Sequence, residues 1–289
     1  MKSLPVRRSV RVLVSGACLS LAAVAAHAQS ASSVVNYVQG TGASAGYDNP
    51  SAALGDPSRV TPGQFGGPVD PFAPPYLNSQ LVSIGAGGSL TVQFSSPIFN
   101  NPSNPFGLDF LVFGNSGFVV TNAYDESFNP IGTPATDGSL FGGGATASIS
   151  VSTDGQTFFT LSPELSPAID AMFPTDGSGD FGTPVNPGLK GTDFAGLTLE
   201  DIRALYAGSG GGTGFDLAWA RDASGAPVTV DLVRFVRVEV TEGKADLDGF
   251  SSVSTVPEPS TWALIVLGCG VFIPACLRRR AFSLNASRR

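Results

Sequence analysis

The sequence predicts an all-β fold: a jelly-roll-like β-sandwich with one short helix, set between an N-terminal signal peptide and a C-terminal transmembrane helix. The long middle of the 289-residue chain is rich in Gly, Pro, Ser, Thr, Asn and Phe. Its apolar runs are short, alternate with polar residues and are separated by turn signals. Short alternating runs joined by turns are typical of sandwich strands, whereas amphipathic helices repeat with a longer period.

Residues 1–28 have the three parts of a secretory signal peptide. Four cationic side chains come first: Lys2, Arg7, Arg8 and Arg11. An apolar run follows, and Ala26-His27-Ala28 forms a small-x-small cleavage site before Gln29. An uncleaved anchor would need a longer apolar run, of about 20 residues. We therefore expect export and cleavage by signal peptidase, with Ala26 and Ala28 as the recognised residues.

Residues 29–250 are expected to form the β-sandwich ectodomain. The run 108–113 is almost continuously apolar, as in a strand that is buried on both faces. The other expected strands alternate apolar and polar residues and lie at 90–94, 147–152, 157–161 and 236–240.

One helix is expected after Thr198. Thr198 and Asp201 have capping-box spacing, and Gly208 can end the helix. Three apolar residues share one face of this helix: Leu199, Ile202 and Leu205.

The C-terminal end has the parts of a membrane-spanning tail. Residues 251–260 form a Pro-containing linker, 261–277 an apolar run, and 278–289 a basic cytoplasmic tail. As a helix, the apolar run would rise about 25 Å, just enough to cross the hydrocarbon layer. The arginines after it would hold that end in the cytoplasm by the positive-inside rule.

This tail resembles the PEP-CTERM sorting signal of exported bacterial proteins. The residues that carry the resemblance are Pro257, Glu258, Pro259, Arg278, Arg279 and Arg280. The resemblance implies a transient stay in the inner membrane, cleavage near the motif by an exosortase-type enzyme, and transfer to the cell surface or extracellular matrix. Pro274 within the apolar run and the residues 281–289 after the arginines depart from the family pattern. A single-pass anchor with a Pro-rich stalk is the alternative.

The order of motifs in the ectodomain is similar to that of galactose-binding-like and discoidin-like surface domains. The similar stretches lie at 34–37, 54–57, 82–90, 109–115, 151–155, 212–218 and 235–238. The resemblance implies a β-sandwich and does not define a ligand.

The composition of the mature segment excludes several function classes. Between Gln29 and Val256 lie 7 of the 16 Lys and Arg and 22 of the 23 Asp and Glu, so this segment has a net charge of −15. Such a surface repels nucleic-acid phosphates and tolerates divalent cations. The only histidine, His27, leaves with the signal peptide, and the three cysteines lie in the two ends. Ser-His-Asp and Cys-His mechanisms and His-ligated zinc are thereby excluded.

Two glycine-rich motifs resemble catalytic or nucleotide-binding loops only in part. Gly42-Ala43-Ser44-Ala45-Gly46 matches the nucleophile elbow but has no histidine partner, so we interpret it as a flexible loop. The run 210–214 lacks the Lys-Ser/Thr of a phosphate-binding loop, and we interpret it as a connection to Phe215.

Two pairs of aspartates are candidate calcium ligands. Asp176 and Asp180 stand at positions 1 and 5 of a Gly/Ser loop, although Pro187 at position 12 excludes an EF-hand. Asp246 and Asp248 lie on one side of an extended segment, where a hard cation would bridge them. Solvated turns are the alternative in both places.

The leading hypothesis is a non-catalytic surface or matrix protein that binds polysaccharide or another envelope component, or that has a structural role without a discrete ligand. Exposed aromatics would stack on sugars, and the candidates are Tyr47, Phe72, Tyr76 and Trp219. The alternative is a secreted carbohydrate-active hydrolase, which would place two carboxylates about 5 to 9.5 Å apart in a cleft.

Overall fold

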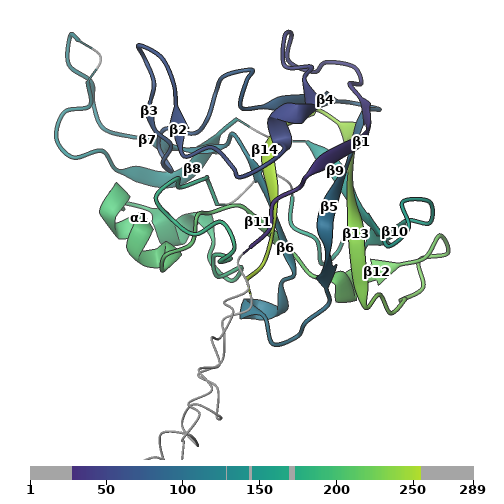
Figure 1. The fold of residues 1–289 in the computed structure, drawn as a ribbon. Helices are drawn as coiled ribbons and strands as arrows, with labels where there is room; N and C mark the ends of the chain where they lie inside the picture. The colour runs from purple at the N-terminus through teal and green to yellow at the C-terminus, as the bar shows by residue number, and fades with distance from the viewer. Residues whose placement is uncertain (1–27, 128, 143–144, 169–172, 255–289) are drawn as a thin grey trace, which may run out of the picture. The chain divides into compact units, whose positions relative to one another are not determined.

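The computed structural model describes residues 28–127, 129–142, 145–168 and 173–254 (Figure 1). The predicted signal peptide up to residue 27, the sorting motif at 257–259, the apolar run at 261–277 and the arginines at 278–280 lie outside the described residues. Within the described ranges, no helix has both the length and the apolar character that a membrane crossing requires.

Two antiparallel sheets form a β-sandwich-like body. The larger has the strand order β1-β5-β13-β9-β10-β12, and the smaller has the order β11-β6-β14-β4. The strands of the larger sheet are β1 (Ser33–Val38), β5 (Ser89–Phe99), β13 (Leu232–Glu242), β9 (Thr146–Ser152), β10 (Phe159–Leu161) and β12 (Ala220–Arg221). Those of the smaller sheet are β11 (Thr213–Phe215), β6 (Phe110–Gly114), β14 (Lys244–Ser252) and β4 (Val82–Gly85). The coarse prediction of a mostly β domain is confirmed.

The remaining elements are short. The two hairpins consist of β2 (Val60–Thr61) with β3 (Gly67–Pro68), and β7 (Gly117–Val120) with β8 (Thr136–Phe141). The helical elements are η1 (Pro50–Ala53), η2 (Pro105–Gly107), η3 (Gly191–Phe194), η4 (Leu217–Trp219) and α1 (Leu199–Tyr206), the one α-helix of the described residues.

The main core lies between the two sheets and follows the alternation of the sequence. In β13, Val236 and Val240 are buried, while Arg237 and Glu239 between them are partly exposed. The buried valines belong to one hydrophobic cluster with residues of the opposite sheet, such as Phe250 of β14. The period of two thus places one face of each strand in the core.

β6 is buried on both faces, as its continuous apolar sequence predicts. Phe110 belongs to the main core, where its ring stacks on that of Phe215 at 5.4 Å. Phe113 belongs to a second cluster, in which its ring meets Phe181 edge-on at 5.2 Å. The segment 173–182 therefore supplies part of the cover for the outer face of the smaller sheet.

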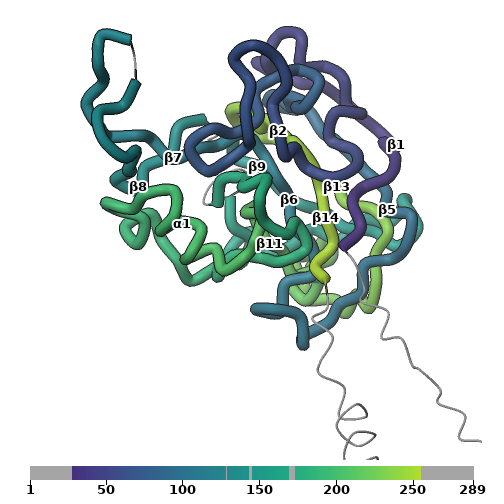
Figure 2. The backbone as a smooth tube through the Cα atoms, turned by 60° about the vertical axis from the view of Figure 1, so that its left-hand side comes forward, coloured from purple at the N-terminus to yellow at the C-terminus, as the bar shows by residue number. Residues whose placement is uncertain are grey.

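Beside the sheets, β7, β8, η3 and α1 form a side lobe, seen at the left of Figure 1 and again in Figure 2. The lobe has its own aromatic core, in which the ring centroids of Phe118 and Phe194 lie 4.7 Å apart. The ring of Phe194 also meets the ring of Tyr206 edge-on, with the centroids 6.3 Å apart. A hydrophobic cluster of its own thus holds the elements of the side lobe together.

α1 begins as the sequence predicts and buries one of its sides. Thr198 and Asp201 form the capping box, and the chain leaves the helix through Ala207, whose φ is 51°. Ile202 and Tyr206 are buried, whereas Leu205 is 36% exposed. Ile202 and Tyr206, four residues apart, therefore form the buried side of α1, and Leu205 lies at the exposed edge of that face.

The two ends of the described chain lie side by side. Gln29 exchanges hydrogen bonds with Ser252: its N donates to Ser252 Oγ at 2.9 Å, and its carbonyl accepts from Ser252 N at 2.8 Å. Ser254 N donates to the carbonyl of Gly182 at 2.8 Å. Ser251 and Ser252 belong to β14, so regular structure extends into the segment 251–260 that the sequence predicts as a linker.

Two neighbouring substitutions test the packing of α1. Ile202→Ala should lower the free energy of unfolding by about 3 kcal/mol, because it leaves a cavity beneath the helix. Leu205→Ala, its matched control on the exposed face, should change that free energy by less than about 1 kcal/mol. Urea denaturation of both variants measures the difference. Equal losses would contradict the described orientation of α1.

Candidate functional site

Exposed aromatic rings surround a hollow beside the β2–β3 hairpin. Phe65 is 86% exposed, Tyr76 44% and Phe141 45%, and all three line a hollow of about 420 Å³. Large apolar side chains are seldom left so exposed in a group unless they contact something. The three rings are therefore the first feature that indicates a binding surface.

Two of the three rings are held in place by a hydrogen bond or by close packing. The hydroxyl of Tyr76 donates to the carbonyl of Phe65 at 3.0 Å, and the hydroxyl of Tyr47 donates to the carbonyl of Tyr76 at 2.6 Å. Phe141 packs over Gly117, where a Cβ atom would lie 2.6 Å from the ring. Since the fold sets the positions of the Tyr76 and Phe141 rings, a ligand would not have to order these two.

A second, larger hollow adjoins the first. Its volume is about 750 Å³, and it shares Asp70 and Ala73 with the aromatic hollow. Phe72, Glu200 and Arg203 also line it. We call the two hollows together the aromatic groove.

Asp70 lies at the junction of the two hollows and shapes the turn between them. Its Oδ1 accepts from the backbone N of Phe72 at 2.8 Å and of Ala73 at 3.0 Å. Its charge also acts on Arg203 across the second hollow. The groove therefore combines apolar rings with charged groups of both signs.

The predicted calcium loop holds two arginines. Asp176 accepts from Arg203 Nε at 2.7 Å and from Arg203 Nη2 at 3.0 Å. Arg59 Nη1 donates to the carbonyls of Gly177 and Gly179 at 2.7 and 3.0 Å. Burial alone would raise the pKa of Asp176, but the hydrogen bonds from Arg203 and Ser178 outweigh it and lower that pKa. The loop oxygens thus bind guanidinium groups.

Asp180, Asp246 and Asp248 bind separate partners. Asp180 accepts from Gly182 N at 2.9 Å and from the hydroxyl of Thr183 at 3.0 Å. Asp246 Oδ2 pairs with Lys244 at 2.9 Å. In the part of the chain that the structure describes, no three His, Cys, Asp or Glu side chains group together so as to hold a metal ion. A calcium site at these aspartates stays a prediction.

Asp248 is buried against the N-terminal part of the domain. Its carboxylate accepts from Ser58 N and from Ser58 Oγ, both at 2.7 Å. The residue as a whole is 2% exposed. Burial raises the pKa of Asp248 to about 7, although both hydrogen bonds act to lower it.

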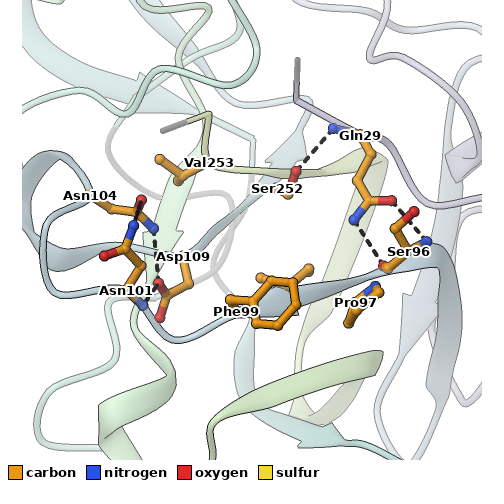
Figure 3. Close-up of a pocket in the computed structure, with 10 residues that line it drawn as sticks. Gln29, Ser96, Pro97, Phe99, Asn101, Asn104, Asp109, Ser252 and Val253 are labelled. Atoms are coloured by element: carbon orange, nitrogen blue, oxygen red, sulfur yellow. Dashed lines mark hydrogen bonds between the residues drawn. The ribbon is translucent and has the colours of Figure 1, made fainter. Parts of the chain in front are cut away.

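A third hollow of about 310 Å³, the end pocket, contains a buried aspartate that sequence reasoning missed (Figure 3). Asp109 Oδ1 accepts from Asn101 N and Asn104 Nδ2, both at 3.0 Å, and Oδ2 accepts from Leu217 N at 2.9 Å. Burial raises the pKa of Asp109 to about 6 against these hydrogen bonds. The position of Asp109 inside the apolar run 108–113 is the signal that would have identified it as a buried acid.

The two glycine-rich motifs have structural roles. Ser44 N donates to Ser83 Oγ at 2.8 Å, and Ser44 Oγ accepts from Lys244, so the predicted flexible loop is tied to β4 and β14. The run 210–214 leads into β11 as expected, and a Cβ at Gly212 would lie 2.7 Å from the ring of Phe113.

Of the four aromatics that the sequence suggests for sugar stacking, two line the groove. Tyr76 and Phe72 border its two hollows, Tyr47 supports Tyr76, and Trp219 packs against the core. Phe65 and Phe141 were missed. A phenylalanine inside a glycine-rich turn, as in Gly63-Gln64-Phe65-Gly66-Gly67, is a signal that would have identified the first.

Comparison with protein-family models gives no match for this chain, and comparison with curated proteins gives none either. The chemistry of the hollows is therefore what indicates a function.

The raised pKa values of the buried carboxyls predict that the domain is more stable at mildly acidic pH than at pH 8. A carboxyl whose pKa is about 7 when folded and 3.8 when unfolded binds its proton more tightly in the folded chain. This contribution is complete below pH 3.8 and disappears as the pH rises through about 7. The free energy of unfolding should therefore increase from pH 8 to pH 5, by up to about 1.4 kcal/mol per pH unit for each such group.

Asp248→Asn should remove a large part of this increase. Its amide keeps an acceptor for Ser58 N and offers a donor to the Ser58 hydroxyl. Denaturant titrations at several pH values measure how the free energy of unfolding changes with pH, with exposed Asp231→Asn as the control. A slope that Asp248→Asn leaves unchanged would contradict the assignment.

Proposed function

We propose that this chain is an exported cell-surface or extracellular-matrix protein whose jelly-roll-like sandwich binds polysaccharide without catalysis, along the aromatic groove. The observation that carries the proposal is the group of exposed rings, Phe65, Tyr76 and Phe141, around one hollow that opens beside a second. Exopolysaccharide or another envelope glycan is the proposed ligand class.

The chemistry of the groove supports a glycan ligand. Sugar rings present C–H faces that pack on aromatic rings, and their hydroxyls form hydrogen bonds with charged and hydroxyl side chains. The first hollow supplies the rings, and Asp70, Glu200 and Arg203 supply polar groups in the second. Two adjoining hollows suit several residues of a polymer better than a single small molecule. The net charge of −15 in the mature segment favours a glycan that is not strongly anionic.

Delivery to the surface is proposed from the two ends of the sequence. Signal peptidase would release the N-terminus after Ala28, and an exosortase-type enzyme would cut near Pro257-Glu258-Pro259. The described chain begins and ends at one end of the domain, and β2 lies toward the other end in both ribbon and tube views (Figures 1 and 2). A groove placed there is accessible while either end is still attached to a membrane.

A hydrolase is the second candidate, because the structure places two carboxylates in one hollow. Asp70 and Glu200 both line the larger hollow of the groove. Paired carboxylates are what acid-base glycoside hydrolysis requires. Release of reducing ends that is lost in both Asp70→Asn and Glu200→Gln would favour the hydrolase over the binding protein.

Removing single rings should weaken glycan binding. Tyr76→Ala and Phe141→Ala should each lower the affinity about tenfold, since each removes a stacking surface. Affinity electrophoresis in gels that contain a neutral β-glucan or the producing cells' exopolysaccharide measures the change. Phe106→Ala removes a ring that is 56% exposed and lines neither hollow, so it serves as the control. Equal retardation of all variants would exclude the groove as the binding surface.

Replacing Pro257-Glu258-Pro259 with Ala-Ala-Ala should leave the protein uncut in the inner membrane. Cell fractionation and intact-mass measurement follow the product, and the unchanged chain should be recovered from the surface or medium without its tail. Arrival of the triple variant in the medium at the normal mature mass would show that this motif does not direct sorting.

A further inference from the structure

The end pocket is the third hollow, and the proposed function does not use it. It shares no lining residue with the aromatic groove, and it lies where β5 ends and the N-terminal residues meet β14. Its volume of about 310 Å³ is at the small end of the range for ligand sites. The space is sufficient for one sugar ring and not for a chain.

One wall of the end pocket is an exposed aromatic ring. Phe99 at the end of β5 is 58% exposed and lies between the two polar sides of the pocket in Figure 3. Ile98 and Val253, which are 3% and 8% exposed, add apolar surface beside it. This combination offers a flat apolar contact of the kind that a pyranose face uses.

The asparagine side chains of the pocket have both an unused donor and an unused acceptor. Asn101 Nδ2 donates to Asn104 Oδ1 at 3.1 Å, and Asn104 Nδ2 donates to Asp109 Oδ1 at 3.0 Å. Each amide nitrogen has a second hydrogen, and each amide oxygen accepts one bond and keeps a second lone pair. Asp109 Oδ1 accepts two hydrogen bonds. The pocket therefore suits a ligand group that brings an acceptor together with a donor, as an amide does.

The charges nearby decide which acceptor is suitable. Asp109 contributes a carboxyl to the wall, and the mature segment has a net charge of −15, so a ligand carboxylate or phosphate would be repelled. A neutral carbonyl group would not be repelled by these negative charges. An acetamido group supplies such a carbonyl together with a methyl group for the apolar surface.

We propose that the end pocket binds a single N-acetylated amino sugar, with its ring on Phe99 and its acetamido carbonyl accepting from the amides of Asn101 and Asn104. The site is independent of the aromatic groove and gives the protein a second glycan specificity, for one acetamido sugar unit rather than a run of residues.

Ligand-observed saturation-transfer NMR on the full-length protein in detergent tests this assignment. The probes are the methyl glycosides of N-acetylglucosamine, glucosamine and glucose. The acetamido glycoside should show saturation at its acetyl methyl and ring protons, with millimolar affinity, and the other two should bind at least tenfold more weakly. Phe99→Ala should weaken binding at least tenfold, and Phe99→Trp should retain it. Since Phe99 is exposed, neither change endangers the fold.

Tyr76→Ala separates this site from the proposed function. It should leave the saturation of the acetamido glycoside unchanged, because Tyr76 lines only the groove. Loss of signal in Tyr76→Ala but not in Phe99→Ala would overturn the end pocket and leave the groove standing. Equal saturation by the three glycosides, or none by any of them, would also overturn the proposal, whatever the groove binds.

Discussion

The structure depends on the burial of β14 on both of its faces. Eight of its nine residues are buried, and it pairs with β4 on one side and β6 on the other. Its apolar side chains, such as Phe250, complete the core between the sheets, while Asp248 on the other side binds Ser58 and fixes the N-terminal loop. Because a buried carboxylate is costly unless it is hydrogen-bonded or protonated, that loop can leave only with a large loss of stability.

Arginine takes a structural part in a domain with few basic residues. The guanidinium of Arg203 binds both oxygens of Asp176, and that of Arg59 lies over the ring of Phe181 at 4.2 Å while it binds two loop carbonyls. A planar cation with five donors can satisfy several loop oxygens at once. Arg203 thus connects the 176–180 loop to α1, and Arg59 connects the same loop to the start of β2.

The sequence predicted the features that depend on local pattern. The alternation in β13, the continuous apolar run in β6 and the capping box of α1 follow from period and spacing, and the structure agrees with each. The burial of Tyr206 was missed because Tyr206 and Leu205 both fit an apolar helix face until the neighbouring rings are known.

The hollows were harder to predict because they are made by residues far apart in the chain. Tyr76 lies in the connection between β3 and β4 and Phe141 at the end of β8, and only the fold brings both to one hollow. Asp109 is held by contacts with Asn101 and Leu217. The pattern 176–180 indicated a cation, but the arginines that bind its oxygens lie in other segments. Local spacing alone does not show which side chains from other segments bind the oxygens of such a loop.

The position of β14 at the end of the chain also affects the order in which the domain is built. The smaller sheet lacks a central strand until residues 244–252 are present, and the backbone bonds that Gln29 and Ala31 make to Ser252 and Phe250 cannot form until then. Contacts between the first and last parts of a chain are slow to form, since a long loop must close before they add stability. A chain of this topology cannot complete its smaller sheet until its last strand is available, which suits the export proposed above, because an exported chain crosses the translocation channel before it folds.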